Sequence, residues 1–206
     1  MKTILGLLLI LSTINIAAQH KNSITMEYPR LAKNQMELAD LRSWLEIGYQ
    51  PVYFNGPGIQ GKDYYIVMKE IWYGTVKKTD TIVNTPSSQF FEPVKDTLKL
   101  TVMSGKSSQK SLRVQFNFER FSINTECLAT LSDDYSMRVF GTHVTIEPNK
   151  PFYAFAYILP YEKDNNKYYC AVEGSGKDIE SWGKEFGIEH YVLFEMCFFD
   201  RKTTKK

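Results

Sequence analysis

The alternation of apolar and polar residues is clearest in two neighbouring segments, residues 97–105 and 111–120. In the first segment, Leu98, Leu100 and Val102 occupy every second position, and the second segment repeats the pattern with four apolar residues. A period of two places one side of a strand in a core and the other side in water. The pattern therefore predicts an antiparallel hairpin, with the intervening residues as its loop.

Other segments are apolar on both sides, which indicates strands in the interior of a sheet. Residues 63–76 are rich in β-branched and aromatic residues and predict a central strand, and residues 189–199 predict a last strand. Residues 137–148 predict a shorter hairpin that turns at Gly141. Residues 122–131 are compatible with a short helix, although their Ser, Asn and Thr residues weaken that interpretation.

Two segments have apolar residues at helical spacing. In residues 34–47, Asn34 is a suitable N-cap, and the leucines at positions 38, 41 and 45 fall on one face. Residues 178–186 predict a second helix, and Gly187 follows it where a C-terminal cap belongs. The order of elements predicts an α+β fold, predominantly antiparallel β-sheet with two packed helices. A β-sandwich is the alternative.

A tyrosine-rich segment provides the candidate binding residues. Residues 152–161 and 168–173 predict a hairpin with residues 162–167 as its loop, and its two apolar faces favour a place in the core. The alternative is a sugar-binding surface, because phenol rings can stack on a sugar while neighbouring polar groups bond to its hydroxyls. That alternative assigns binding to Tyr161, Tyr168, Tyr169, Asp164 and Asn165.

Residues 1–18 have the features of a secretory signal peptide. Lys2 precedes an apolar run that is too short to span a bilayer, and Ala17 and Ala18 are the small residues typical of a cleavage site. Cleavage there leaves residues 19–206 as a single globular domain, exported to the periplasm or the cell exterior. No Cys stands at the cleavage point and no later run is long enough to cross a membrane, so we expect neither a lipid anchor nor a membrane span.

The balance of charged residues argues against nucleic acid as a partner. The chain has 25 Lys and Arg residues against 23 Asp and Glu residues, and this near-balance gives no long-range attraction to nucleic acid. Its three cysteines permit at most one disulfide. Cys170 and Cys197 are the candidate pair, and buried free thiols are the alternative.

Patterns for nucleophilic or metal chemistry are weak. Cys127, His143 and Asp133 or Asp134 supply the residue types of a nucleophilic site, but the local signatures of cysteine proteases are missing. The His and Cys spacings match no zinc site, and the segments rich in Asp and Asn are typical of turns rather than calcium loops. We therefore expect no metal and no cofactor.

Carboxylates on predicted strands leave one catalytic possibility. Glu70, Glu173 and Glu195 are candidates for an extracytoplasmic hydrolase, which requires two of them to converge in one pocket. Glu195 lies in an apolar run, and in a central strand it needs a partner such as Arg113 or Arg138.

Export, balanced charge and many tyrosines without a catalytic motif favour a non-catalytic binding or interaction module for a carbohydrate or an envelope partner. The hydrolase is the alternative. An assembly subunit that exchanges a strand at a sheet edge is a third possibility.

Overall fold

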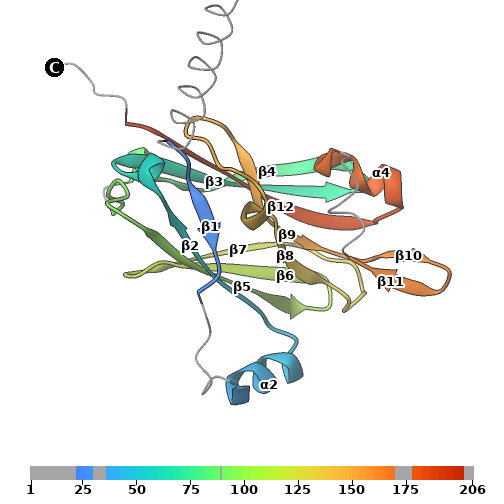
Figure 1. Cartoon of the computed structure of the whole chain (residues 1–206). Helices are drawn as coiled ribbons and strands as arrows, with labels where there is room; N and C mark the ends of the chain where they lie inside the picture. The colour runs from blue at the N-terminus through green and yellow to red at the C-terminus, as the bar shows by residue number, and fades with distance from the viewer. Residues whose placement is uncertain (1–21, 30–35, 89, 170–177, 202–206) are drawn as a thin grey trace, which may run out of the picture.

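The protein is a sandwich of two five-stranded antiparallel sheets (Figure 1). The computed structural model describes residues 22–29, 36–88, 90–169 and 178–201. The first sheet has the order β1 (Thr25–Glu27), β2 (Gly48–Asn55), β5 (Leu98–Ser108), β6 (Ser111–Asn117) and β7 (Ser122–Leu128). The second sheet has the order β4 (Thr75–Asn84), β3 (Lys62–Trp72), β12 (His190–Asp200), β9 (Phe152–Ile158) and β8 (Ser136–Val139).

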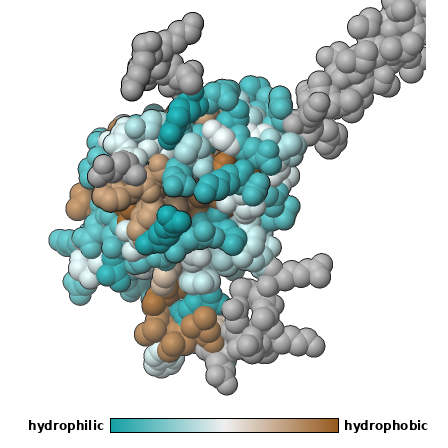
Figure 2. Space-filling view, turned by 90° about the vertical axis from the view of Figure 1, so that its left-hand side faces the viewer, coloured by the Kyte–Doolittle hydropathy of each residue, from teal (hydrophilic) through white to brown (hydrophobic). Residues whose placement is uncertain are grey.

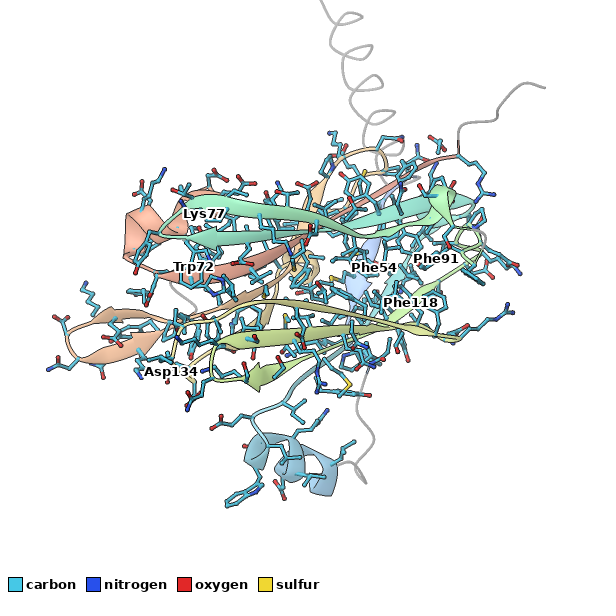
Figure 3. All side chains as sticks on the ribbon, turned by 180° about the vertical axis from the view of Figure 1, so that it is seen from behind. Phe54, Trp72, Lys77, Phe91, Phe118 and Asp134 are labelled. Carbon is cyan, nitrogen blue, oxygen red and sulfur yellow. The ribbon has the colours of Figure 1, made fainter. Side chains whose placement is uncertain are left out.

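Aromatic side chains from both sheets fill the space between the layers. The rings of Phe116 on β6 and Phe194 on β12 have centroids 5.1 Å apart, and those of Phe54 on β2 and Phe198 on β12 are 5.3 Å apart. All four side chains are fully buried, and Figure 3 shows Phe54 between the layers. These contacts make the two inner faces one continuous core.

The strongest strand predictions are confirmed. Residues 97–120 form the β5–β6 hairpin, in which Leu100 and Val102 face the core. Residues 63–76 supply β3, a central strand between β4 and β12. That strand ends earlier than predicted, because Tyr73 and Gly74 have φ values of 50° and 68° and turn the chain into β4. The fold is therefore predominantly antiparallel β, as predicted.

Two local predictions are wrong. Residues 122–131 contain the strand β7 rather than a helix, because Ile123, Thr125 and Cys127 alternate toward the core and pair in register with β6. The predicted hairpin at residues 137–148 does not form. Its first half is β8, which pairs with β9, and in its second half Ile146 makes only an isolated bridge to Ile24.

The second predicted helix packs as expected. Residues 178–186 form a short 3-10 turn, η5 (Ile179–Ser181), and the helix α4 (Trp182–Phe186), and Gly187 caps it with φ 70°. Trp182 is buried in a cluster with Ala156 and Leu193 on the outer face of the second sheet. Other short 3-10 turns are η2 (Pro57–Ile59), η3 (Thr85–Ser87) and η4 (Gly141–His143).

The first predicted helix forms, but its leucines do not enter the core. The helix α2 (Met36–Trp44) stands off the outer side of the first sheet, and Leu38, Leu41 and Leu45 are 45%, 53% and 52% exposed. Figure 2 shows the resulting apolar surface at the bottom of the view. No helix in the described ranges is long and apolar enough to cross a bilayer.

Candidate binding surface

The outer face of the first sheet combines tyrosines with amide side chains. Strand register brings these residues side by side, because side chains directly opposite each other in paired strands lie on the same face. We call this surface the tyrosine face. It consists of Glu27 on β1, Tyr49, Pro51 and Tyr53 on β2, Lys99, Thr101 and Met103 on β5, Arg113, Gln115 and Asn117 on β6, and Asn124 and Glu126 on β7.

The centre of this face is half-buried rather than covered. Tyr49, Pro51 and Tyr53 occupy every second position of β2, and the intervening Val52 and Phe54 are buried in the core. Two strands away, the Gln115 amide donates a hydrogen bond of 2.6 Å to Asn117 Oδ1, which orients the amide column. The alternation of β2 thus places a column of ring surface near a column of polar groups.

Two depressions meet on the tyrosine face. One, which we call the hollow, measures about 380 Å³ and is lined by residues that include Tyr49, Tyr53 and Asn117. The other, which we call the cleft, also measures about 380 Å³, and Met103 is one of its lining residues. Because Tyr49 and Met103 are direct cross-strand partners, the hollow and the cleft adjoin at this pair.

The helix α2 stands beside the junction of the two depressions. The Arg42 guanidinium lies over the Tyr49 ring, 4.6 Å from its centroid, and this cation–π contact ties the helix to the face. The residues after the helix, Leu45, Glu46 and Ile47, line the cleft. The segment that follows the helix therefore forms one wall of the cleft.

The inner wall of the cleft reaches the end of the core. Tyr135 and Tyr157 line it with ring centroids 5.4 Å apart, and burial raises the pKa of both phenols, which keeps them neutral. Lys106 lines the cleft too, and its Nζ donates to Asp133 Oδ1 at 2.9 Å. Apolar rings and an already paired lysine thus surround the opening.

The tyrosine residues predicted from the sequence lie elsewhere. Tyr161 and Tyr168 pair in the small hairpin of β10 (Tyr161–Lys163) and β11 (Asn166–Tyr168), and their rings stack with centroids 5.4 Å apart. Asp164 and Asn165 are its two-residue turn, with φ values of 52° and 60°. Figure 1 shows this hairpin projecting from the end of the sandwich.

The base of that hairpin touches a loop beside the cleft. Tyr169 donates a hydrogen bond of 2.5 Å to the carbonyl oxygen of Asp134, and Lys167 Nζ lies 2.6 Å from Asp134 Oδ2. Asp134 adjoins Asp133 and Tyr135, which line the cleft, and Figure 3 shows it at the edge of the sandwich. The predicted set therefore forms one hairpin outside the tyrosine face.

The two strand carboxylates that the structure describes, Glu70 and Glu195, do not form a pair. Glu70 lies on the inner face of the second sheet, where Trp72 Nε1 donates to it at 2.7 Å. Glu195 lies on the outer face of the same sheet. Glu173 is outside the described residues. The two described candidates, Glu70 and Glu195, therefore lie on opposite faces of one sheet and do not share a pocket.

Glu195 has a partner different from those expected. Lys69 Nζ lies 2.9 Å from Glu195 Oε2 and 2.7 Å from Glu180 Oε1, so one lysine links β3 and β12 to η5. Tyr65 donates to Glu195 at 3.1 Å. The hydrogen bond from Lys69 holds the pKa of Glu180 below its usual range. This network anchors η5 on the outer face of the second sheet.

The nucleophile pattern is not assembled among the groups that the structure places. Burial raises the pKa of the Cys127 thiol to about 12, so the thiol stays protonated at neutral pH. Asp133 and Asp134 are each bound to a lysine, Lys106 and Lys167. Within the described ranges, no three His, Cys, Asp or Glu residues are grouped as metal ligands. Cys197 is a buried free thiol, and Cys170 lies outside those ranges.

The sequence contains a visible signal for the tyrosine face that segment-by-segment reasoning misses. Tyrosines at positions 49 and 53 flank Pro51 with a period of two, the signature of one strand face. Pro51 is more obviously a residue that ends the preceding helix, and that interpretation hides the strand.

The chain matches no family model, and no curated protein or solved structure shows significant similarity to it.

Proposed function

We propose that the protein is an exported, non-catalytic module that binds a carbohydrate chain on the tyrosine face. The observation that supports this proposal most directly is the half-buried column Tyr49, Pro51 and Tyr53 near the amides of Gln115 and Asn117. Pyranose rings present C–H surfaces that pack on aromatic rings, and their hydroxyls pair with amide groups. The adjoining hollow and cleft give such a chain a continuous path.

The two acids on the strands of this face lie too far apart to serve as a glycosidase pair. Glu27 on β1 and Glu126 on β7 lie at opposite edges of the sheet, four strand spacings apart. At about 4.8 Å per spacing they are about 19 Å apart, whereas glycosidase carboxylates are about 5–9.5 Å apart. These two residues are therefore too distant to act on one glycosidic bond.

Export is part of the same proposal. The expected signal peptide, residues 1–18, directs the chain to a compartment where polysaccharides of cell walls and surfaces are exposed. The near-balance of positive and negative charge suits a ligand recognised by stacking and hydrogen bonds rather than by net charge.

Removal of one tyrosine ring tests the proposal. We expect Tyr53→Ala to weaken carbohydrate binding at least tenfold, because truncated aromatic anchors commonly cost more than about 1.4 kcal/mol of binding free energy. Its folding stability should change little, since the ring lies on the solvent side of the sheet. Titration calorimetry with oligosaccharides identified on a glycan array measures the first effect, and thermal unfolding measures the second.

Tyr73→Ala is the matched control for this experiment. Tyr73 is 61% exposed and lies in the β3–β4 turn of the other sheet, so its ring is remote from the tyrosine face. Equal loss of binding in the two variants contradicts the proposal. An array on which no carbohydrate binds contradicts it as well.

A further inference from the structure

One cation of the cleft, the exposed Arg113, has no ion-pair partner among the residues that the structure describes. Lys106 is neutralised by Asp133, but Arg113 makes no ion pair or hydrogen bond with any residue in the described part of the chain. A guanidinium presents a planar set of donors that matches a carboxylate with two parallel hydrogen bonds. The free charge at the cleft therefore suits a carboxylate more than a neutral group.

A buried hydroxyl in the same cleft is also unsatisfied. Ser104 lines the cleft and is only 3% exposed, yet its Oγ makes no hydrogen bond. The hydroxyl is close enough to Tyr157 to influence the pKa of that phenol, but the two groups do not meet hydrogen-bond geometry. Ser104 alternates with Gly105 along β5, so its hydroxyl lies on the core side of the sheet, whereas the guanidinium of Arg113 lies on the tyrosine face.

Gly105 keeps space open beside Arg113. The two residues are direct cross-strand partners, and both line the cleft. A Cβ added at Gly105 meets no atom within 4 Å, and its φ is not in the left-handed region. Neither packing nor backbone conformation therefore requires glycine here. Its effect is to leave the guanidinium accessible from the cleft.

We infer that the cleft holds the carboxylate of a uronic acid residue, with Arg113 as its ion-pair partner. Glu46, which makes no side-chain ion pair in the described part of the chain, lines the same cleft and accepts from the hydroxyls of this sugar. This assignment rests on the proposed carbohydrate function, because the other sugars of the same oligosaccharide would continue over Tyr49 into the hollow. It makes the ligand an acidic polysaccharide.

The test compares uronic acid oligosaccharides with the same oligosaccharides after reduction of their carboxylates to alcohols. We expect the acidic forms to bind at least tenfold more tightly, and Arg113→Gln to abolish that preference while the weaker binding of the reduced forms persists. Gly105→Val should block both forms without loss of stability, since its side chain fills open space. Ser104→Ala should leave binding unchanged and the unfolding midpoint equal or higher, because it removes an unpaired hydroxyl on the core side of the sheet.

Arg120→Gln is the control, since Arg120 is an exposed arginine that does not line the cleft. Equal affinity for acidic and reduced forms overturns the carboxylate assignment while the carbohydrate function stands. An acid preference that survives Arg113→Gln overturns the role of Arg113. Absence of binding to every oligosaccharide overturns both the assignment and the proposed function.

Discussion

Acidification from pH 7 to pH 5 is expected to remove about 2 kcal/mol of folding stability through a single side chain, His190. This residue is completely buried between the sheets, and burial lowers its pKa to about 4. In the unfolded chain a histidine titrates near pH 6.5. The unfolded state therefore binds the proton more tightly, and the stabilisation is fully present above pH 6.5 and lost as the pH falls toward 4.

The surroundings of His190 explain why it stays neutral. The Trp72 ring lies against the imidazole, with centroids 4.3 Å apart, and Tyr135 Oη lies 2.7 Å from Nδ1. With the tyrosine as donor, the ring proton is on Nε2 and faces Glu70 Oε1 at 4.0 Å. That distance is too long for a strong hydrogen bond, and Nε2 remains unpaired, so the cost of burying an imidazolium dominates.

Replacement of His190 by phenylalanine isolates its contribution. Urea unfolding at pH 7, 6 and 5 should show the wild-type protein losing about 2 kcal/mol more than His190→Phe over this interval, since each pKa unit corresponds to about 1.4 kcal/mol. The difference between the two proteins is the informative quantity, because carboxylates such as Glu180 contribute to both. Parallel pH profiles would show that His190 does not set the acid sensitivity.

The sequence predicts the strands better than it predicts their neighbours. The apolar positions of residues 97–105 and 111–120 identify the β5–β6 hairpin, because a short loop forces the two strands together. The alternation of apolar and polar residues does not indicate which strand pairs with the second edge of β5, the edge that does not face β6. Its partner is β2, some fifty residues earlier in the chain, and only that pairing brings Tyr49 beside Met103.

The strand β7 and the exposed leucines of α2 both differ from the sequence-based expectation, and they do so for the same physical reason. The strand β7 is locally unremarkable in sequence, but its pairing with β6 outweighs its weak local preference for a helix. The leucine stripe of α2 follows the usual pattern of a core-facing helix, yet the core is already closed by two sheets and the stripe remains exposed. Tertiary context decides both cases, and it also assembles the tyrosine face from five separate strands.

Gly183→Ala is expected to destabilise the fold by about 3 kcal/mol, at the upper end of the usual range for overpacked sites. Gly183 is the second residue of α4, and a Cβ there would lie 2.0 Å from the backbone nitrogen of Gly74. Glycine is unfavourable within a helix. It is required here because α4 packs directly against the β3–β4 turn, and backbone atoms on both sides leave no flexible side chain to move aside.

Two other glycines separate the effect of a steric clash from the effects of backbone strain and of chain entropy. Gly105→Ala meets no atom within 4 Å and should leave stability unchanged or slightly higher, because alanine suits a strand as well and restricts the unfolded chain. Gly187→Ala has equal space but a φ of 70°, so it should cost about 1 kcal/mol from backbone strain alone. Urea unfolding of the three variants should therefore rank Gly183→Ala lowest in stability. If Gly183→Ala instead matches Gly187→Ala, then α4 can move away from the turn at little cost, and the close approach of the two backbones does not hold this end of the sandwich together.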